Sequence, residues 1–183
     1  MSASRAVLAA FEAKFAEIRR ESENAIGQLD SIAIRQSLDG DTNSVAVTMK
    51  HVGGTLRSRF TDFLKEDGEK ASRDREGEFV DDFAQGDAGR EQAVAAWKAG
   101  WSVLEATLAS LADDDLEKSV RIRGVPHTVA HALTRAVAHM AYHQGQITLI
   151  ARILVGPARW NTISIPRGGT ARRHSEMGFD PKA

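Results

Sequence analysis

Four stretches of the chain place apolar residues three or four positions apart with charged residues between them, which is the pattern of an amphipathic helix. They cover approximately residues 8–29, 44–64, 87–111 and 126–155. The third stretch is the most regular, and its apolar positions are Val94, Trp97, Trp101, Leu104, Leu108 and Leu111. We therefore predict an all-α protein in which four antiparallel helices form a four-helix bundle, with both tryptophans in its core or at a dimer interface.

The ends of these helices are predicted from residues that favour helix caps. Asn43 or Ser44 is the expected N-cap of the second helix, and Asp87 is the expected N-cap of the third. Pro126 is expected in the first turn of the fourth helix, where a missing N–H is tolerated. Gly156 is expected to end that helix.

The segments outside the four helices are less regular. Residues 65–90 form a connection far longer than the usual bundle loop of about 2 to 8 residues, so they either cover something or are mobile. Residues 116–125 alternate apolar and charged side chains and predict a short extended piece. The tail from about residue 156 has no periodicity, and the pair Gly53–Gly54 is expected to weaken the second helix locally.

Length and composition narrow the possible classes of protein. The 183 residues fit one domain over residues 1–183, and the absence of cysteine excludes disulfides, thiolate metal sites and cysteine nucleophiles. A net charge of -1, with 24 basic and 25 acidic residues spread along the chain, argues against a nucleic-acid partner. No run is apolar enough for a signal segment or a membrane span, so we expect a cytoplasmic protein with no membrane partner.

Two histidines lie four residues apart within the apolar run of the fourth helix. His139 and His143 bracket Met140 of the apolar stripe, so both are expected to face the bundle, where one ion can bind both rings. His127 and His131 fall on the outer side or near the helix start. The pair lacks the glutamate of the HExxH motif, and spacing alone leaves open a structural, hydrogen-bonded role.

His51 is the one histidine outside the fourth helix and the tail. It lies away from the apolar stripe of the second helix, on a face of small side chains that suits a cavity wall: Ser44, Val47, Thr48, Thr55 and Ser58. A solvated histidine beside Lys50 fits the same position. Periodicity does not choose between these interpretations.

Several motifs together carry a resemblance to a known group of proteins. They are NSVAVTMKHVGG in the second helix, RDREGEF in the long connection, WKAGW in the third helix, HMAYHQGQI in the fourth and WNTISIPRG in the tail. Over roughly residues 5 to 170 the chain resembles the DinB-like superfamily of four-helix metal-binding proteins, and within it one uncharacterised family. The resemblance implies a metal site formed by His51, His139 and His143, and it implies a homodimer.

Three neutral imidazoles leave a divalent cation with an open position, as in catalytic zinc sites. The resemblance implies an enzyme that uses zinc, nickel or manganese to activate either a low-molecular-weight thiol, as in S-transferases, or water, as in hydrolases, on a small-molecule substrate. A metal-dependent binding or stress-response module without turnover is an alternative. A third interpretation has the histidines hydrogen-bonded in the core without any metal.

Other polar residues near these motifs have two interpretations each. Gln146 shares a heptad position with His139, so either it hydrogen-bonds a ligand or it is solvated, and the same choice applies to Gln144. Tyr142, the single tyrosine, is a candidate proton donor, although its position favours a helix interface.

Charged residues gather after the glycine pair and in the long connection, namely Arg57, Arg59, Arg73, Asp74, Arg75 and Glu78. Either the arginines frame an anionic substrate over the metal, because guanidinium binds carboxylate or phosphate with a two-donor fork, or they pair with the neighbouring acids and order the connection. The arginines of the SIPRGG tail and beyond, Arg167, Arg172 and Arg173, either close the cleft or belong to a disordered or intermolecularly packed tail.

Overall fold

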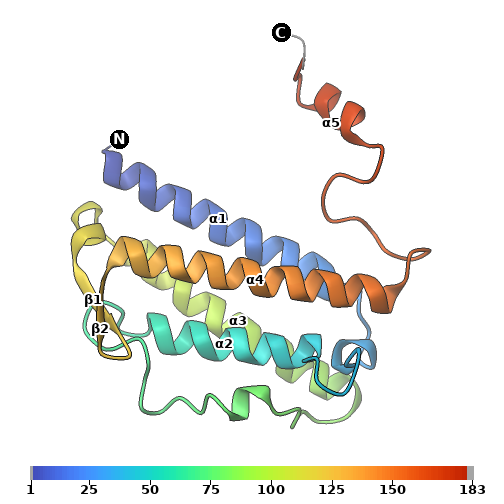
Figure 1. Ribbon diagram of the computed structural model, residues 1–183, viewed down its shortest axis with the longest axis horizontal. Coiled ribbons are helices and arrows are strands. Elements are labelled where there is room, and N and C mark those ends of the chain that lie inside the picture. The colour runs from blue at the N-terminus through green and yellow to red at the C-terminus, as the bar shows by residue number, and fades with distance from the viewer. Residues whose placement is uncertain (1, 181–183) are drawn as a thin grey trace.

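The computed structural model describes residues 2–180 and is mostly helical, with four long helices lying side by side (Figure 1). These helices are α1 (Ala3–Ile26), α2 (Val45–Phe60), α3 (Gly86–Ser110) and α4 (Val129–Val155). A short helix α5 (Thr170–Glu176) lies in the tail. Strands β1 (Ser119–Ile122) and β2 (Val125–Thr128) and the single 3-10 turns Ala33–Arg35, Gly77–Phe79 and Asp113–Glu117 complete the described elements.

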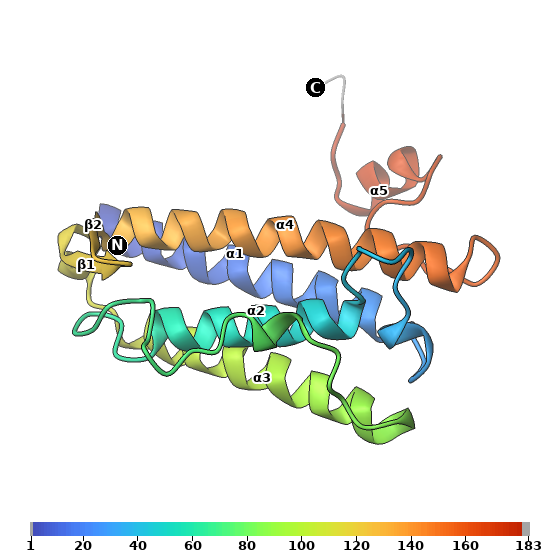
Figure 2. The same cartoon turned by 60° about the horizontal axis from the view of Figure 1, so that its bottom comes forward.

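The four long helices form two layers that enclose one apolar core. α2 packs against α3, and α1 packs against α4, as Figure 2 shows. The apolar stripes predicted from the sequence supply the core: the largest fully buried side chains include Trp101, Phe15, Phe60, Leu8, Met49, Leu104, Leu133 and Ile147. Both tryptophans of α3 lie in this core rather than at the surface. The predicted helical pattern is therefore confirmed at the positions that bury apolar surface.

The glycine pair of α2 has a packing role that the sequence pattern did not indicate. The helix runs without a break from Val45 to Phe60. A Cβ on Gly53 would lie 2.3 Å from the carbonyl oxygen of Ala96, and one on Gly100 would lie 2.6 Å from the Cα of Gly53. The absence of side chains here allows α2 and α3 to approach closely, which is the physical reason for these glycines.

The segment before α4 corrects two predictions. Pro126 lies in β2 and not in the first turn of α4, which instead begins after Thr128, whose side chain accepts a hydrogen bond from the backbone N–H of His131. β1 and β2 pair in an antiparallel hairpin. The extended piece predicted before the last helix is thus one half of a hairpin, because Pro126 and its neighbours continue the extended backbone. The fold is mostly helical with a small sheet, not all-α.

The remaining predicted ends are confirmed except at α3. Ser44 caps α2 by accepting from the N–H of Val47, and α4 ends at Gly156, whose φ of 78° suits glycine. Asp87 is not the N-cap of α3: Gln85 occupies that place, and Asp87 lies in the first turn, where its charge favours the helix dipole.

The tail leaves the end of α4 and carries α5 away from the four long helices, in both views (Figures 1 and 2). It contains one short helix that the sequence pattern did not predict. Within residues 2–180, no helix combines the length and the apolar character needed to cross a membrane.

We expect Gly53→Ala to lower the free energy of unfolding by about 2 kcal/mol, because the new methyl group meets the backbone of α3 and the strain outweighs the helix propensity of alanine. Gly145→Ala is the matched control, since nothing lies within 4 Å of the added methyl group on α4. Urea denaturation measures both. Equal effects of the two substitutions would contradict the packing role of Gly53.

Candidate metal centre

The three histidines implied by the family resemblance come together between α2 and α4. His51 belongs to α2, His139 and His143 belong to α4, and one ring nitrogen from each lies within 4.8 Å of the others. The ring centroids are 5.6 Å apart for His51 and His139, 5.0 Å for His51 and His143, and 4.5 Å for His139 and His143. His51 is only 5% exposed, so the interpretation of a solvated histidine is wrong.

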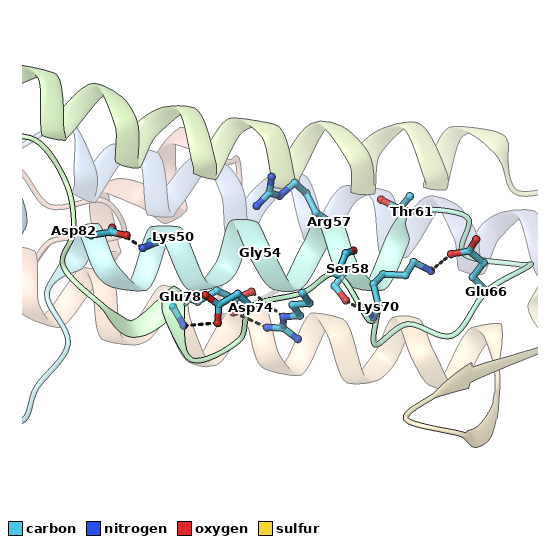
Figure 3. Close-up of a pocket in the computed structure, with 13 residues that line it drawn as sticks. Lys50, Gly54, Arg57, Ser58, Thr61, Glu66, Lys70, Asp74, Glu78 and Asp82 are labelled. Carbon is cyan, nitrogen blue, oxygen red and sulfur yellow. Dashed lines mark hydrogen bonds and ion pairs between the residues drawn. The ribbon is translucent and has the colours of Figure 1, made fainter.

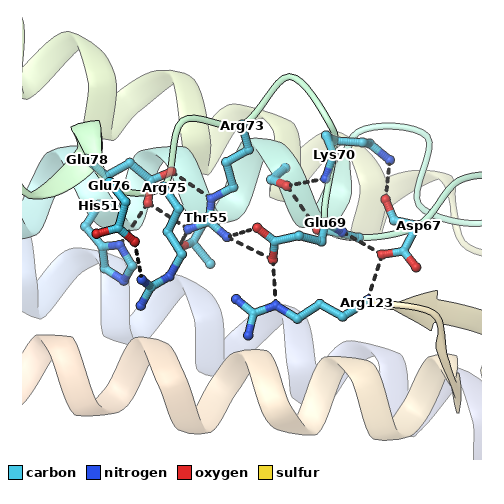
Figure 4. Close-up of polar contacts among 12 residues, drawn as sticks. His51, Thr55, Asp67, Glu69, Lys70, Arg73, Arg75, Glu76, Glu78 and Arg123 are labelled. Atoms are coloured by element: carbon cyan, nitrogen blue, oxygen red, sulfur yellow. Dashed lines mark hydrogen bonds and ion pairs between the residues drawn. The ribbon is translucent and has the colours of Figure 1, made fainter.

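Glu78 holds the His51 ring from the opposite side. The Nδ1 atom of His51 lies 2.9 Å from Oε2 of Glu78, and Arg73 donates to both oxygens of the same carboxylate at 2.8 and 2.7 Å (Figure 4). Burial opposes ionisation of Glu78, but the hydrogen bonds from Arg73 and then from His51 outweigh it and lower the pKa of the carboxyl below its ordinary value. An ionised carboxylate only accepts hydrogen bonds, so Nδ1 of His51 carries a proton, and in the neutral ring the lone pair is then on Nε2.

The long connection between α2 and α3 brings Glu78 to this place. Asp74 accepts a hydrogen bond from the backbone N–H of Gly77 and so supports the turn Gly77–Phe79. A Cβ on Gly54 would lie 2.0 Å from Oε1 of Glu78, so the second glycine of the pair makes room for the carboxylate. Phe79 stacks on the His51 ring with centroids 4.5 Å apart. The long connection therefore covers His51, which is the first of the two roles that its length predicts.

Gln146 holds the second inward ring of α4. Its Oε1 lies 2.7 Å from Nδ1 of His143, and its amide Nε2 donates to the hydroxyl of Tyr142 at 3.1 Å. Because the amide oxygen is an acceptor, Nδ1 of His143 carries the proton, and its Nε2 faces Nε2 of His139 at 3.0 Å. The sequence allows Gln146 either to hydrogen-bond a candidate ligand or to be solvated, and the contact with His143 confirms the hydrogen bond.

The charge state of the α4 histidines follows from their surroundings. Burial, then the neighbouring His143 and His51, lower the pKa of His139 to about 3, and burial, then His51, lower that of His143 to about 4. Both rings are neutral at pH 7 and present lone pairs rather than positive charge. Neutral imidazole is the form that binds a metal ion.

The donor set fits a divalent metal ion. Zinc binds imidazole nitrogen at about 2.1 Å, so two nitrogens that share it lie at most about 4.2 Å apart, and the present spacing within 4.8 Å needs only a small adjustment of side chains. A carboxylate behind one ligand and an amide behind another are the partners that metal-binding histidines commonly have.

Other residues singled out in the sequence lie elsewhere. Gln144 bonds Glu21 of α1, and Tyr142 is 63% exposed rather than at a helix interface. His131 is exposed in the first turns of α4, whereas His127 is half-buried and lies in β2 rather than on the helix, and their Nδ1 atoms are 3.3 Å apart. The tail arginines Arg167, Arg172 and Arg173 are exposed and away from the site. Arg172 and Arg173 pair with Glu176.

Two cavities flank the long connection. One of about 370 Å³ is lined by His51 and His139 together with several arginines, and it opens directly on the histidine cluster. A larger one of about 600 Å³ lies between α2 and the connection and contains none of the three histidines (Figure 3). Arg57 lines the larger cavity, so it is not part of the cluster, whereas Arg59 lines the smaller one.

Glu78 is the residue whose role sequence reasoning missed. It was grouped with the charged residues of the long connection, without any link to His51, which is 27 positions away. No periodicity connects a residue in an irregular segment with a helix face. The RDREGEF motif, which contains Glu78, carried part of the family resemblance and was the one available indication.

Comparison with known proteins gives a family but no activity. A family model described as "Protein of unknown function (DUF1572)" matches residues 2–169, which is most of the chain, so the chain belongs to this family. No curated protein and no solved structure matches.

We expect the chelator-treated protein to lose stability as the pH falls from about 6.5 toward 4. A histidine in the unfolded chain titrates near 6.5, whereas His143 titrates at about 4 in the fold, so between these values the unfolded state binds more protons. At pH 5 the loss from His143 is on the order of 2 kcal/mol. Urea denaturation at pH 7 and pH 5 measures it.

The variants of this experiment separate His143 from other titrating groups. His143→Gln removes its share of the pH dependence, and His131→Gln, which changes an exposed histidine of the same helix, leaves the dependence as in the wild type. A His143→Gln protein as sensitive to pH as the wild type would show that this assignment is wrong.

Proposed function

We propose that this member of the DUF1572 family binds a divalent metal ion through His51, His139 and His143 and acts as a metal-dependent enzyme on a small-molecule substrate. One observation carries the proposal: three imidazoles from two helices converge, and two of them are held from behind by Glu78 and Gln146. A hydrogen bond at Nδ1 fixes the tautomer and the orientation of each ring, as the hydrogen-bond partners of metal-binding histidines do. Zinc, nickel and manganese are the candidate ions.

A bound divalent ion in this position supplies positive charge that activates a thiol or water nucleophile. Glu78 then serves as an orienting group and not as a proton acceptor, because Arg73 and His51 already hold its carboxylate in the ionised form. Phe79 and the connection that carries it restrict water on the His51 side. The family resemblance supports both transfer of a low-molecular-weight thiol and hydrolysis. A binding module without turnover is the alternative.

We also propose that the fold is a DinB-like four-helix bundle in a single domain and that two copies form a homodimer. The two layers of paired long helices support the bundle. The homodimer is supported by apolar side chains that are exposed along α4, namely Tyr142, Leu149 and Ile153. Sedimentation equilibrium tests the dimer, and a single species of 19.9 kDa would contradict it.

Elemental analysis of protein purified without a histidine tag tests the metal site. We expect close to one divalent ion per chain in the wild type and a small fraction of that in His143→Ala, because the variant loses a buried ligand. His131→Ala removes an exposed histidine from the same helix and should retain the ion. A wild-type content far below one ion per chain, unchanged in His143→Ala, would contradict the proposal.

The second arm of this experiment tests the role given to Glu78. Glu78→Gln should weaken metal binding about 10- to 100-fold in a competition titration with a chelator, since it removes the partner of His51 but no ligand. Glu76→Gln, at an exposed neighbouring carboxylate, should leave the affinity unchanged. Equal affinities of the two variants would mean that Glu78 does not position His51.

Turnover separates the enzyme from the binding module. We expect metal-loaded protein either to transfer thiols from a panel of low-molecular-weight thiols to model electrophiles, or to hydrolyse esters or amides, at a rate that His143→Ala reduces at least 100-fold. Product formation followed by chromatography measures both reactions. No metal-dependent turnover with any substrate of either panel would favour the module.

A further inference from the structure

The smaller cavity beside the histidine cluster is lined by an unusual set of charges. Its lining contains five arginines and no acidic residue: Arg59, Arg73, Arg75, Arg123 and Arg135. The remaining lining residues are His51, Thr55, Ile122, Ala138 and His139. We call this cavity the arginine pocket. Its wall comes from α2, the long connection, the β1–β2 hairpin and α4, so four separate parts of the fold direct cations to one place.

Carboxylates compensate only part of this charge. Arg73 pairs with Glu78 and with Glu69, and Arg123 shares Glu69. Arg75 pairs with the exposed carboxylate of Glu76.

Arg59 and Arg135 have no ion pair within residues 2–180. Five guanidinium groups therefore face three carboxylates, and two positive charges of the pocket remain uncompensated.

Arg59 is the arginine in the least favourable environment of the pocket. It is half-buried, and its Nε atom is buried without a hydrogen-bond partner among the described residues. Burial, then the nearby charges of Arg135 and Arg73, lower the pKa of its guanidinium below the ordinary value. A buried N–H without an acceptor and a cation among like charges are both unfavourable, and an anion bound in the pocket offsets the repulsion between the like charges.

The position of the pocket indicates which molecule would bring that anion. His51 and His139 line the same cavity as Arg59, so a molecule that fills it touches both the histidine cluster and the arginines. A volume of about 370 Å³ admits a small molecule and not a polymer.

We propose that Arg59 and Arg135, assisted by Arg123, bind a carboxylate or phosphate group of the substrate, whose reacting group then lies at the three histidines. The position of the reacting group rests on the proposed function. The binding of an anion in the pocket does not. The guanidinium groups fix the substrate by two-donor hydrogen bonds, which discriminate against neutral analogues.

The test uses the full chain, as purified and after chelation, in isothermal titrations with inorganic phosphate and separately with malonate, at pH 7 and constant ionic strength. We expect saturable binding of at least one of the two anions in both forms. Arg59→Gln should weaken it about tenfold or more, and Arg135→Gln, at an exposed position where folding is not at risk, should also weaken it. Arg57→Gln is the matched control, an exposed arginine of the same helix outside the pocket, and should change binding less than twofold.

Stability gives a second readout that does not depend on activity. Without added anion, Arg59→Met should unfold at the same temperature as the wild type or higher, because it removes an unsatisfied N–H and a like charge. Phosphate should raise the unfolding temperature of the wild type and not that of the variant.

Two outcomes would overturn the anion site. One is the absence of saturable binding of both anions, and the other is weakening by Arg57→Gln equal to that by Arg59→Gln. The metal content of Arg59→Gln should remain that of the wild type. A chain that binds phosphate but no metal would disprove the proposed function and leave the anion site standing, whereas the reverse result would disprove the anion site alone.

Discussion

The structure of the site depends on one buried carboxylate. The Glu78 carboxylate accepts a hydrogen bond from His51 on one side and from Arg73 on the other. The contact with His51 depends on Arg73, because the guanidinium compensates the buried negative charge. A buried carboxylate without a cation would take up a proton, and a protonated Glu78 could donate to Nδ1 as well as accept from it, so it would no longer fix the His51 tautomer. The same contact anchors an otherwise irregular connection to α2, and Gly54 is required for it because any side chain there would occupy the carboxylate position.

The arginines around this carboxylate have two roles, ordering the connection and binding an anion, which the sequence leaves open as alternatives. Arg73 is an internal partner, since it joins Glu78, Glu69 and the Thr55 hydroxyl. Arg59 lies one helical turn from Thr55 and has no such partner. Ordering the connection and recognising an anion are thus assigned to different arginines, because Glu69 and Glu78 of the connection pair with Arg73 and not with Arg59.

The parts of this fold that follow from local periodicity were predictable, and the parts that follow from tertiary contact were not. His139 and His143 face inward because they bracket Met140 of the apolar stripe, which the spacing alone reveals. His51 required the family resemblance, because a face of small residues suits both a cavity wall and a solvated surface.

The roles of Pro126, Gly53 and Gly54 depend on tertiary contacts in the same way. The extended hairpin continues through Pro126, so a residue that favours a helix start lies in a strand. The role of Gly53 depends on α3, and that of Gly54 on Glu78, both distant in the sequence.

The hydrogen bonds of the cluster also bear on whether the histidines have a purely structural role. Nδ1 carries a proton in His51 and in His143, so in the neutral form of each ring Nε2 is the nitrogen with the lone pair. His139 is neutral and has one N–H, which it can donate to Nε2 of His143 at 3.0 Å. No described protein group then donates to Nε2 of His51, and the His51 residue lines the arginine pocket. A closed network of core histidines would satisfy every nitrogen, whereas this one leaves Nε2 of His51 without a hydrogen-bond partner among the described residues, which supports the proposed metal site over a purely structural role.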